Sequence, residues 1–213
     1  MPELRRWRWG EPVEPLAQRL ATGEVLAIPT ESSYGLAVDP RNRDGVETIY
    51  RIKSRERGKP LLVLVADLDQ ALRLGVRADL PELEILRQVW PAPLTAVLPL
   101  AESRDEDRLP ARAGCATLAI RVPAHTRIRR LIRDVGCPLT ATSANRAGEA
   151  PVLEPDDLEG LLRGFRATLI DDGPLPGGPP STLVQWSDGQ PRILRAGAFD
   201  PALLQQEKKM SYG

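Results

Sequence analysis

The sequence contains few of the residues on which metal sites and nucleophilic enzymes often depend. Its 213 residues include two cysteines, Cys115 and Cys137, and one histidine, His125. Two cysteines without CxxC spacing argue against a disulfide framework or a zinc site, and we expect both to be buried thiols. One histidine excludes histidine-rich metal centres and mechanisms that need two imidazoles. We therefore expect His125 to be a capping or surface residue without a chemical role.

Long hydrophobic runs are also missing. The longest apolar run, Leu61 to Ala66, is far shorter than the roughly 18 to 20 residues that a membrane-spanning helix needs. The first residues carry no secretory signal. We therefore predict a cytoplasmic protein with no membrane association. With 42% apolar and 27% charged residues, the chain can bury a core, and its length favours one α/β or all-β domain.

Net charge is zero, so any site for an anion has to be local. Neither GxxxxGK[ST] nor GxGxxG occurs, so nucleotide binding would need another device. The strongest candidate is a cluster of cations, namely Lys53, Arg55, Arg57 and Lys59. In an extended segment, alternate cations would project to one side and could surround a triphosphate. The competing interpretation is a solvated cluster that favours a helix C-terminus, and the charge pattern alone favours it.

Hydrophobic periodicity predicts strands interspersed with helices. Helices are predicted at 12–22, 44–52 (capped by Asp44), 80–90 (capped by Asp79), 127–135 and 156–163. Strands are predicted at 24–28, 61–66, 94–98, 117–122, 139–142, 167–170, 181–186 and 192–194. Several late strands lack an intervening helix, which indicates an α/β fold with a mixed sheet. Loops are expected at 29–40, 101–114 and 172–180. The short segment 5–9 (RRWRW) is typical of an edge strand or arm, or of a single-stranded nucleic-acid binder.

Three segments at predicted strand ends could bind an anion. Thr142 to Asn145 (TSAN) suits phosphate or carboxylate recognition, although a turn with a helix cap explains it as well. The Pro29 to Gly35 segment (PTESSYG) has the same two interpretations. Arg121 lies late in a strand, where a charge is costly unless it reaches solvent or holds an anion. These segments alone leave both alternatives open.

Taken in order, seven motifs resemble the YrdC family of threonylcarbamoyl-AMP synthases. They extend from about residue 15 to 198 and read PTESSYGLAVDP, KSRERGKPLLVLV, WPAPLTAVLP, TLAIRVP, PLTATSANRAG, STLV and ILRAGA. The resemblance implies a single α/β domain over 1–200 with a twisted mixed sheet and a concave basic cleft, followed by a tail at 201–213. The chain resembles the short form of the family.

The resemblance also implies an activity and its partners. Family members combine L-threonine, bicarbonate or CO2, and ATP with Mg²⁺ into threonylcarbamoyl-AMP and pyrophosphate. A downstream transferase complex then modifies tRNA, so weak tRNA contact is possible for this chain. Catalytic roles would fall on Lys53 and Arg55. The implied ATP-binding residues are Lys53, Arg55, Lys59, Thr117, Ser143, Asn145 and Arg195. The implied threonine-binding residues are Ser32, Arg121, Ala141 (through its backbone) and Ser181. No metal-ligating residue is implied.

This sequence departs from the family pattern at three points. Leu64 stands where many relatives have a histidine, so a threonine contact there would be lost or replaced. The turn reads PTES instead of PTET, and ILRAGA lacks the proline of ILRPGA that stiffens the loop after Arg195. Two alternatives follow: a module that binds structured RNA, and a paralogue with another acyl substrate, such as one that forms carbamoyl-adenylate.

Overall fold

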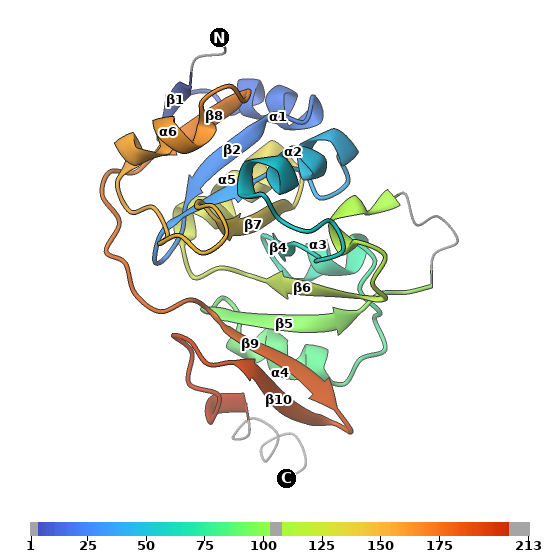
Figure 1. Ribbon diagram of the computed structural model, residues 1–213. Coiled ribbons are helices and arrows are strands. Elements are labelled where there is room, and N and C mark those ends of the chain that lie inside the picture. The colour runs from blue at the N-terminus through green and yellow to red at the C-terminus, as the bar shows by residue number, and fades with distance from the viewer. Residues whose placement is uncertain (1–3, 103–107, 205–213) are drawn as a thin grey trace.

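A mixed β-sheet forms the framework of the protein (Figure 1). The computed structural model describes residues 4–102 and 108–204. Within these residues ten strands lie in the order β1-β8-β2-β3-β7-β4-β6-β5-β9-β10. Their bounds are β1 Arg5–Arg8, β2 Val25–Pro29, β3 Tyr34–Ala37, β4 Leu62–Leu64, β5 Leu94–Pro99, β6 Thr117–Arg121, β7 Leu139–Ser143, β8 Ala167–Asp171, β9 Thr182–Ser187 and β10 Gln190–Arg195. Parallel pairs (β1/β8, β2/β8, β4/β6, β5/β9) occur beside antiparallel ones, which confirms the predicted mixed sheet.

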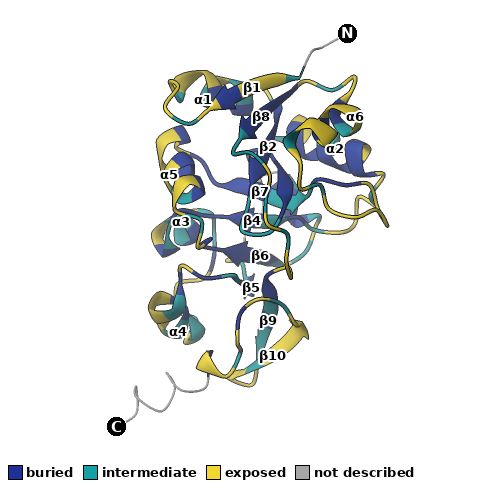
Figure 2. Ribbon diagram, turned by 90° about the vertical axis from the view of Figure 1, so that its left-hand side faces the viewer, coloured by how far each residue is buried: buried dark blue, intermediate teal, exposed yellow. Residues whose placement is uncertain are grey.

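Helices cover both sides of this sheet (Figure 2). Helices α1, α5, α3 and α4 lie on one side, and α2 and α6 lie on the other. Their bounds are α1 Glu14–Ala21, α2 Arg43–Lys53, α3 Leu68–Arg73, α4 Glu82–Val89, α5 Thr126–Val135 and α6 Leu158–Leu162, with 3₁₀ turns at Pro110–Arg112 and Pro155–Asp157.

The apolar run around β4 explains why this strand is central. Val63 packs in a core cluster that includes residues of α2 and α4, whereas Leu64 packs in a second cluster with α1 and α5. Both side chains are fully buried. Since side chains alternate between the two faces of a strand, a run that is apolar at every position is covered on both sides, as predicted.

Two predicted helix caps are wrong. Helix α2 is capped by Asn42, whose Oδ1 accepts from the Gly45 amide at 2.9 Å, and not by Asp44. Helix α4 has Pro81 at its N-cap position, and Asp79 forms an ion pair with Arg77 instead. Each true boundary lies within two residues of the predicted one, and several adjacent residue types can cap a helix, so the sequence does not distinguish them.

The segment predicted as a loop at 29–40 contains a strand. Tyr34–Ala37 forms β3, which pairs antiparallel with β2 and β7, so PTESSYG is a hairpin. Thr30 closes its turn, with its amide and its hydroxyl both donating to the Ser33 carbonyl. A Cβ on Gly35 would lie 3.3 Å from the Thr142 carbonyl oxygen, so glycine allows close approach to β7. This glycine and the serines beside it obscured the strand in the sequence.

The N-terminal RRWRW segment forms the edge strand β1. It pairs parallel with β8. Trp7 is buried and contacts Trp9 edge to face, with ring centroids 5.3 Å apart. Arg6 forms ion pairs with Asp156 and Asp171. The edge-strand prediction is confirmed, because these groups are engaged in packing and ion pairing.

The remaining predictions concern loops, the tail and the cysteines. Residues 172–180 form an irregular connector as expected, whereas 103–107 of the predicted loop at 101–114 lie outside the described residues. The predicted tail lies outside them from residue 205, and Leu204 is buried in the core. Cys137 is buried, which raises its pKa to about 12, whereas Cys115 is only half-buried. None of the described helices is long and apolar enough to cross a membrane.

Candidate active site

A cavity of about 680 Å³ lies against the middle of the sheet. Strand register places Leu62, Ala141 and Ser143 on the same face as Ala119 and Arg121. Further along the same face, towards β1, α1 and α5 cover the sheet. The hairpin turn between β2 and β3, the segment after β7 and the 172–180 connector supply the walls. The cavity therefore lies where cover by these helices ends.

The cavity brings together most of the residues that the family resemblance implied. Seven of them line it: Ser32, Arg55, Arg121, Ala141, Ser143, Ser181 and Arg195. Four do not: Lys53, Lys59, Thr117 and Asn145. The lining residues come from positions between 30 and 195, so folding is what assembles them.

The charge of the cavity wall is positive. Arg55, Arg121 and Arg195 are its only charged lining residues among those that the structure describes, and none of the lining residues is Asp or Glu. Burial lowers the pKa values of Arg121 and Arg195. Guanidinium groups stay protonated at neutral pH even so, and partly desolvated cations attract anions strongly. This arrangement suits a ligand with several negative charges.

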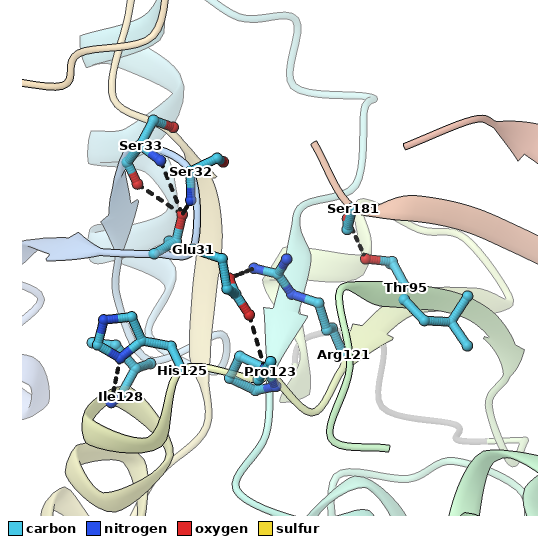
Figure 3. Close-up of polar contacts among 12 residues, drawn as sticks. Glu31, Ser32, Ser33, Thr95, Arg121, Pro123, His125, Ile128 and Ser181 are labelled. Atoms are coloured by element: carbon cyan, nitrogen blue, oxygen red, sulfur yellow. Dashed lines mark hydrogen bonds and ion pairs between the residues drawn. The ribbon is translucent and has the colours of Figure 1, made fainter. Parts of the chain in front are cut away.

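Arg121, the last residue of β6, is 7% exposed (Figure 3). Its Nη2 lies 3.5 Å from Glu31 Oε2, while its buried Nε has no hydrogen-bond partner. Glu31 Oε1 accepts from the Ala124 amide at 2.8 Å. Sequence reasoning missed Glu31, although its place in the PTES turn was a signal. The Arg121 charge is thus only partly compensated by protein.

Lys53 lies behind the cavity wall and not on it. It is the last residue of α2, and Ser54 ends the helix in the left-handed region at φ 50°. Lys53 Nζ donates to the carbonyl oxygens of Ser143 and Asn145 and, at 3.0 Å, to Asn145 Oδ1. Burial, together with the charge of Arg55, lowers the Lys53 pKa to about 8. Lys53 therefore holds the Ser143–Asn145 segment in place, and Asn145 contributes to the wall from beneath.

The predicted fan of alternate cations does not form. The segment begins inside α2 and turns after it, so it is not extended. Lys59 pairs with Glu56 at 2.9 Å and its side chain is 61% exposed, and Arg57 pairs with Glu47. The solvated interpretation holds for these two cations. Arg55 alone reaches the cavity, where Nη2 donates to the Pro60 carbonyl and the buried Nε lacks a partner.

Thr117 and Leu64 also differ from expectation. Thr117 shares a face with Arg121 but lies at the start of β6, beyond the cavity lining. Leu64 is fully buried against α5, so it touches no ligand in the cavity; Leu62, two residues earlier, lines it. The predicted influence of Leu64 on threonine contact is therefore wrong at the level of direct contact.

Ser181 and Arg195 form one unit at the edge of the cavity. Arg195 Nη2 donates to the Ser181 carbonyl at 2.9 Å and to Ser181 Oγ at 3.2 Å. Thr95 Oγ1 lies 2.8 Å from Ser181 Oγ (Figure 3). The loop after Arg195 lacks the family proline, but the Ala198 amide donates to the Pro180 carbonyl and fastens it.

His125 caps α5, as predicted. Its Nδ1 accepts from the Ile128 amide at 3.3 Å. Its Nε2 lies 3.6 Å from Asp172 Oδ2. His125 does not line the cavity, so the site works without an imidazole.

The fold and the cavity define a single-domain α/β protein with a site for anionic ligands. Residues 18–197 match the Sua5/YciO/YrdC family, described as "Telomere recombination", and the chain belongs to this family. It is 38% identical to the threonylcarbamoyl-AMP synthase of Thiobacillus denitrificans over 83% of this chain and 91% of that protein.

Two longer proteins are also similar. The threonylcarbamoyl-AMP synthase of Bacillus subtilis is 36% identical over 86% of this chain, which spans 52% of that protein. The crystal structure of P. abyssi Sua5 complexed with L-threonine superposes with a TM-score of 0.81 at 27% identity, covering 95% of this chain and 60% of that one. The chain thus spans little more than half the length of these two relatives.

Proposed function

We propose that this chain is an L-threonylcarbamoyladenylate synthase, which joins L-threonine, bicarbonate or CO2, and ATP into threonylcarbamoyl-AMP and pyrophosphate. The observation that carries the proposal is the convergence of Arg55, Arg121 and Arg195 on one cavity without a lining carboxylate. The names of the relatives from T. denitrificans and B. subtilis support it, and so does the threonine complex of P. abyssi Sua5.

The threonine side of the site is assigned to the β6 end of the cavity. Arg121 binds the α-carboxylate, which completes the compensation that Glu31 leaves partial. Ser32, Ser181 and the backbone of Ala141 surround the rest of the amino acid. No His, Asp or Glu lines the cavity, so the ammonium group loses its proton to solvent or bicarbonate before the amine captures CO2.

The nucleotide side is assigned to Arg55, Ser143 and Arg195. In the second step a carbamate oxygen attacks the α-phosphorus of ATP, a new P–O bond forms, and the bond to the β-phosphate breaks and releases pyrophosphate. Positioned cations accelerate such a step because they neutralise both the attacking anion and the leaving group. Lys53 acts indirectly, since its three hydrogen bonds fix the Ser143–Asn145 segment.

The described residues offer no separate site for Mg²⁺. No lining residue is acidic, and no group of three or more His, Cys, Asp and Glu residues that could hold a metal occurs in 4–102 or 108–204. Mg²⁺ usually binds one or two carboxylates together with substrate phosphates. Magnesium would therefore arrive on the ATP phosphates, and no step here is assigned to it.

The product implies a partner in the cytoplasm. A mixed anhydride of carbamate and phosphate hydrolyses readily, so a threonylcarbamoyl transferase complex would take it up soon after release and transfer the group to tRNA. Direct tRNA contact by this chain would be weak, because its net charge is zero.

The other two functions have less support. The RNA-binding alternative depended on RRWRW, whose Trp7 is buried and whose Arg6 is paired. The alternative acyl substrate depended on Leu64, which packs against α5 and away from the cavity.

Pyrophosphate release tests the proposed synthase directly. The purified chain with ATP, bicarbonate and Mg²⁺ is expected to release pyrophosphate only when L-threonine is added. Arg55→Ala should reduce this rate by about 100-fold or more, because a cation beside the phosphates is removed. Arg57→Ala is the matched control, since Arg57 lies two residues away and pairs with Glu47 outside the cavity. Release that does not depend on threonine, or equal loss in both variants, would contradict the proposal.

A further inference from the structure

The Thr95 hydroxyl faces Ser181 from inside the sheet. Thr95 lies in β5, opposite Leu183 of β9, and it is fully buried. Its Oγ1 lies 2.8 Å from Ser181 Oγ, and no other hydrogen-bond partner of this oxygen exists among the described residues. Ser181 immediately precedes β9 and lines the cavity. A buried hydroxyl from one strand therefore touches a cavity hydroxyl at the start of the next.

Burial determines which of the two hydroxyl groups donates. A hydroxyl proton without an acceptor costs about 1 to 3 kcal/mol in a buried position. Thr95 has one candidate acceptor, Ser181 Oγ, so Thr95 donates. Arg195 Nη2 donates to the same oxygen at 3.2 Å. Ser181 Oγ thus accepts two hydrogen bonds, and its own proton is left to donate elsewhere.

The remaining acceptors for this proton lie in the cavity. The printed hydrogen bonds within the described chain give Ser181 Oγ no acceptor apart from Thr95, which is already the donor. The cavity beside Ser181 is lined by cations and no carboxylate, so its ligand carries oxygen acceptors. Resting on the proposed function, we infer that Thr95 is a positioning residue that makes Ser181 a hydrogen-bond donor to the bound amino acid.

A hydroxyl deletion at constant shape tests this inference. Thr95→Val keeps the volume and removes the donor, so the Ser181 proton turns back towards Arg195 and the strand or loses its fixed direction. We expect the KM for L-threonine to rise by about tenfold, the fold-change of one hydrogen bond to a charged acceptor. The KM for ATP should change by less than twofold. Thr95→Ser keeps the hydroxyl and should restore the threonine KM.

A double-mutant cycle separates positioning from simple destabilisation. Ser181→Ala should raise the threonine KM as Thr95→Val does, and Thr95→Val should add nothing further in the Ser181→Ala background. A structural role would instead lower the melting temperature of Thr95→Val and leave the threonine KM unchanged, which overturns the inference. Additive effects overturn it as well. If Thr95→Val does not fold, Thr95→Cys, with a weak donor of similar size, should give an intermediate KM, and an unchanged KM would count against the inference.

The proposed function and this inference can fail separately. Wild-type protein without threonine-dependent pyrophosphate release contradicts the synthase. An active wild-type protein whose Thr95→Val and Thr95→Ser variants share one threonine KM contradicts only the role of Thr95.

Discussion

At the scale of single residues, Lys53 shows how burial changes the role of a charged side chain. The lysine was expected to bind phosphate, yet its ammonium group is occupied by the carbonyl groups of Ser143 and Asn145. Spacing in the sequence could not reveal this, because the left-handed Ser54 turns the chain between Lys53 and Arg55. Arg121 was easier to recognise, since a charge inside an apolar strand is conspicuous.

The lowered pKa of Lys53 predicts a pH-dependent stability. The folded chain releases the Lys53 proton near pH 8, whereas the unfolded chain keeps it to about 10.5. Between these values the unfolded state binds more protons, so the unfolding free energy rises with pH. The destabilisation is complete below pH 8. Lys53→Met should remove this rise, which is at most about 3 kcal/mol since one pKa unit corresponds to about 1.4 kcal/mol.

Urea unfolding of both proteins at pH 7.5 and pH 10 measures this difference. The comparison with Lys53→Met cancels the titration of other groups. Parallel behaviour of the two proteins across this range would show that Lys53 folds with an ordinary pKa.

At the scale of elements, long periodic segments were predictable and short ones were not. Helix α5 was located to within one residue because its apolar positions recur over almost three turns and Gly136 ends it. Helix α3 has six residues, too few to display a period, although Asp67 caps it through the Gln70 amide. Strand β3 was missed because Gly35 and the preceding serines suggested a loop.

Helix α2 offers a test of the corrected cap. Asn42→Ala should lower the unfolding free energy by about 1 kcal/mol, because the Gly45 amide loses its acceptor. Asp44→Ala is the control: Asp44 lies inside the first turn, where removing its charge should cost less, at about 0.3 to 1 kcal/mol. Thermal unfolding would measure both. A greater loss for Asp44→Ala would reassign the cap.

At the scale of the whole molecule, the sequence predicted the class of fold but not the spatial order of the strands. Neighbours such as β5 and β9 or β3 and β7 are far apart along the chain, so no local pattern pairs them. The location of the cavity depends on that order. Family resemblance placed seven residues at the cavity correctly, whereas the physical patterns alone left TSAN, PTESSYG and Arg121 ambiguous.

Ligand binding should stabilise the entire domain by mass action. L-threonine at about 100 times its Kd should add about 2.7 kcal/mol, which corresponds to a rise in Tm of roughly 5 to 10 °C for a domain of this size. Arg121→Gln should lose the response to threonine while keeping the response to ATP, because Arg121 is assigned to the carboxylate. Equal responses of both proteins to threonine would remove Arg121 from the amino-acid site.

The cavity residues are distributed from Thr30 to Arg195, nearly the full described length. A proteolytic cut at any interior point would consequently leave neither fragment with a complete set of contacts. Degradation products of this chain should be inert, with no residual turnover that could consume ATP. Recovery of activity from two separately expressed halves would require them to reassemble the whole sheet.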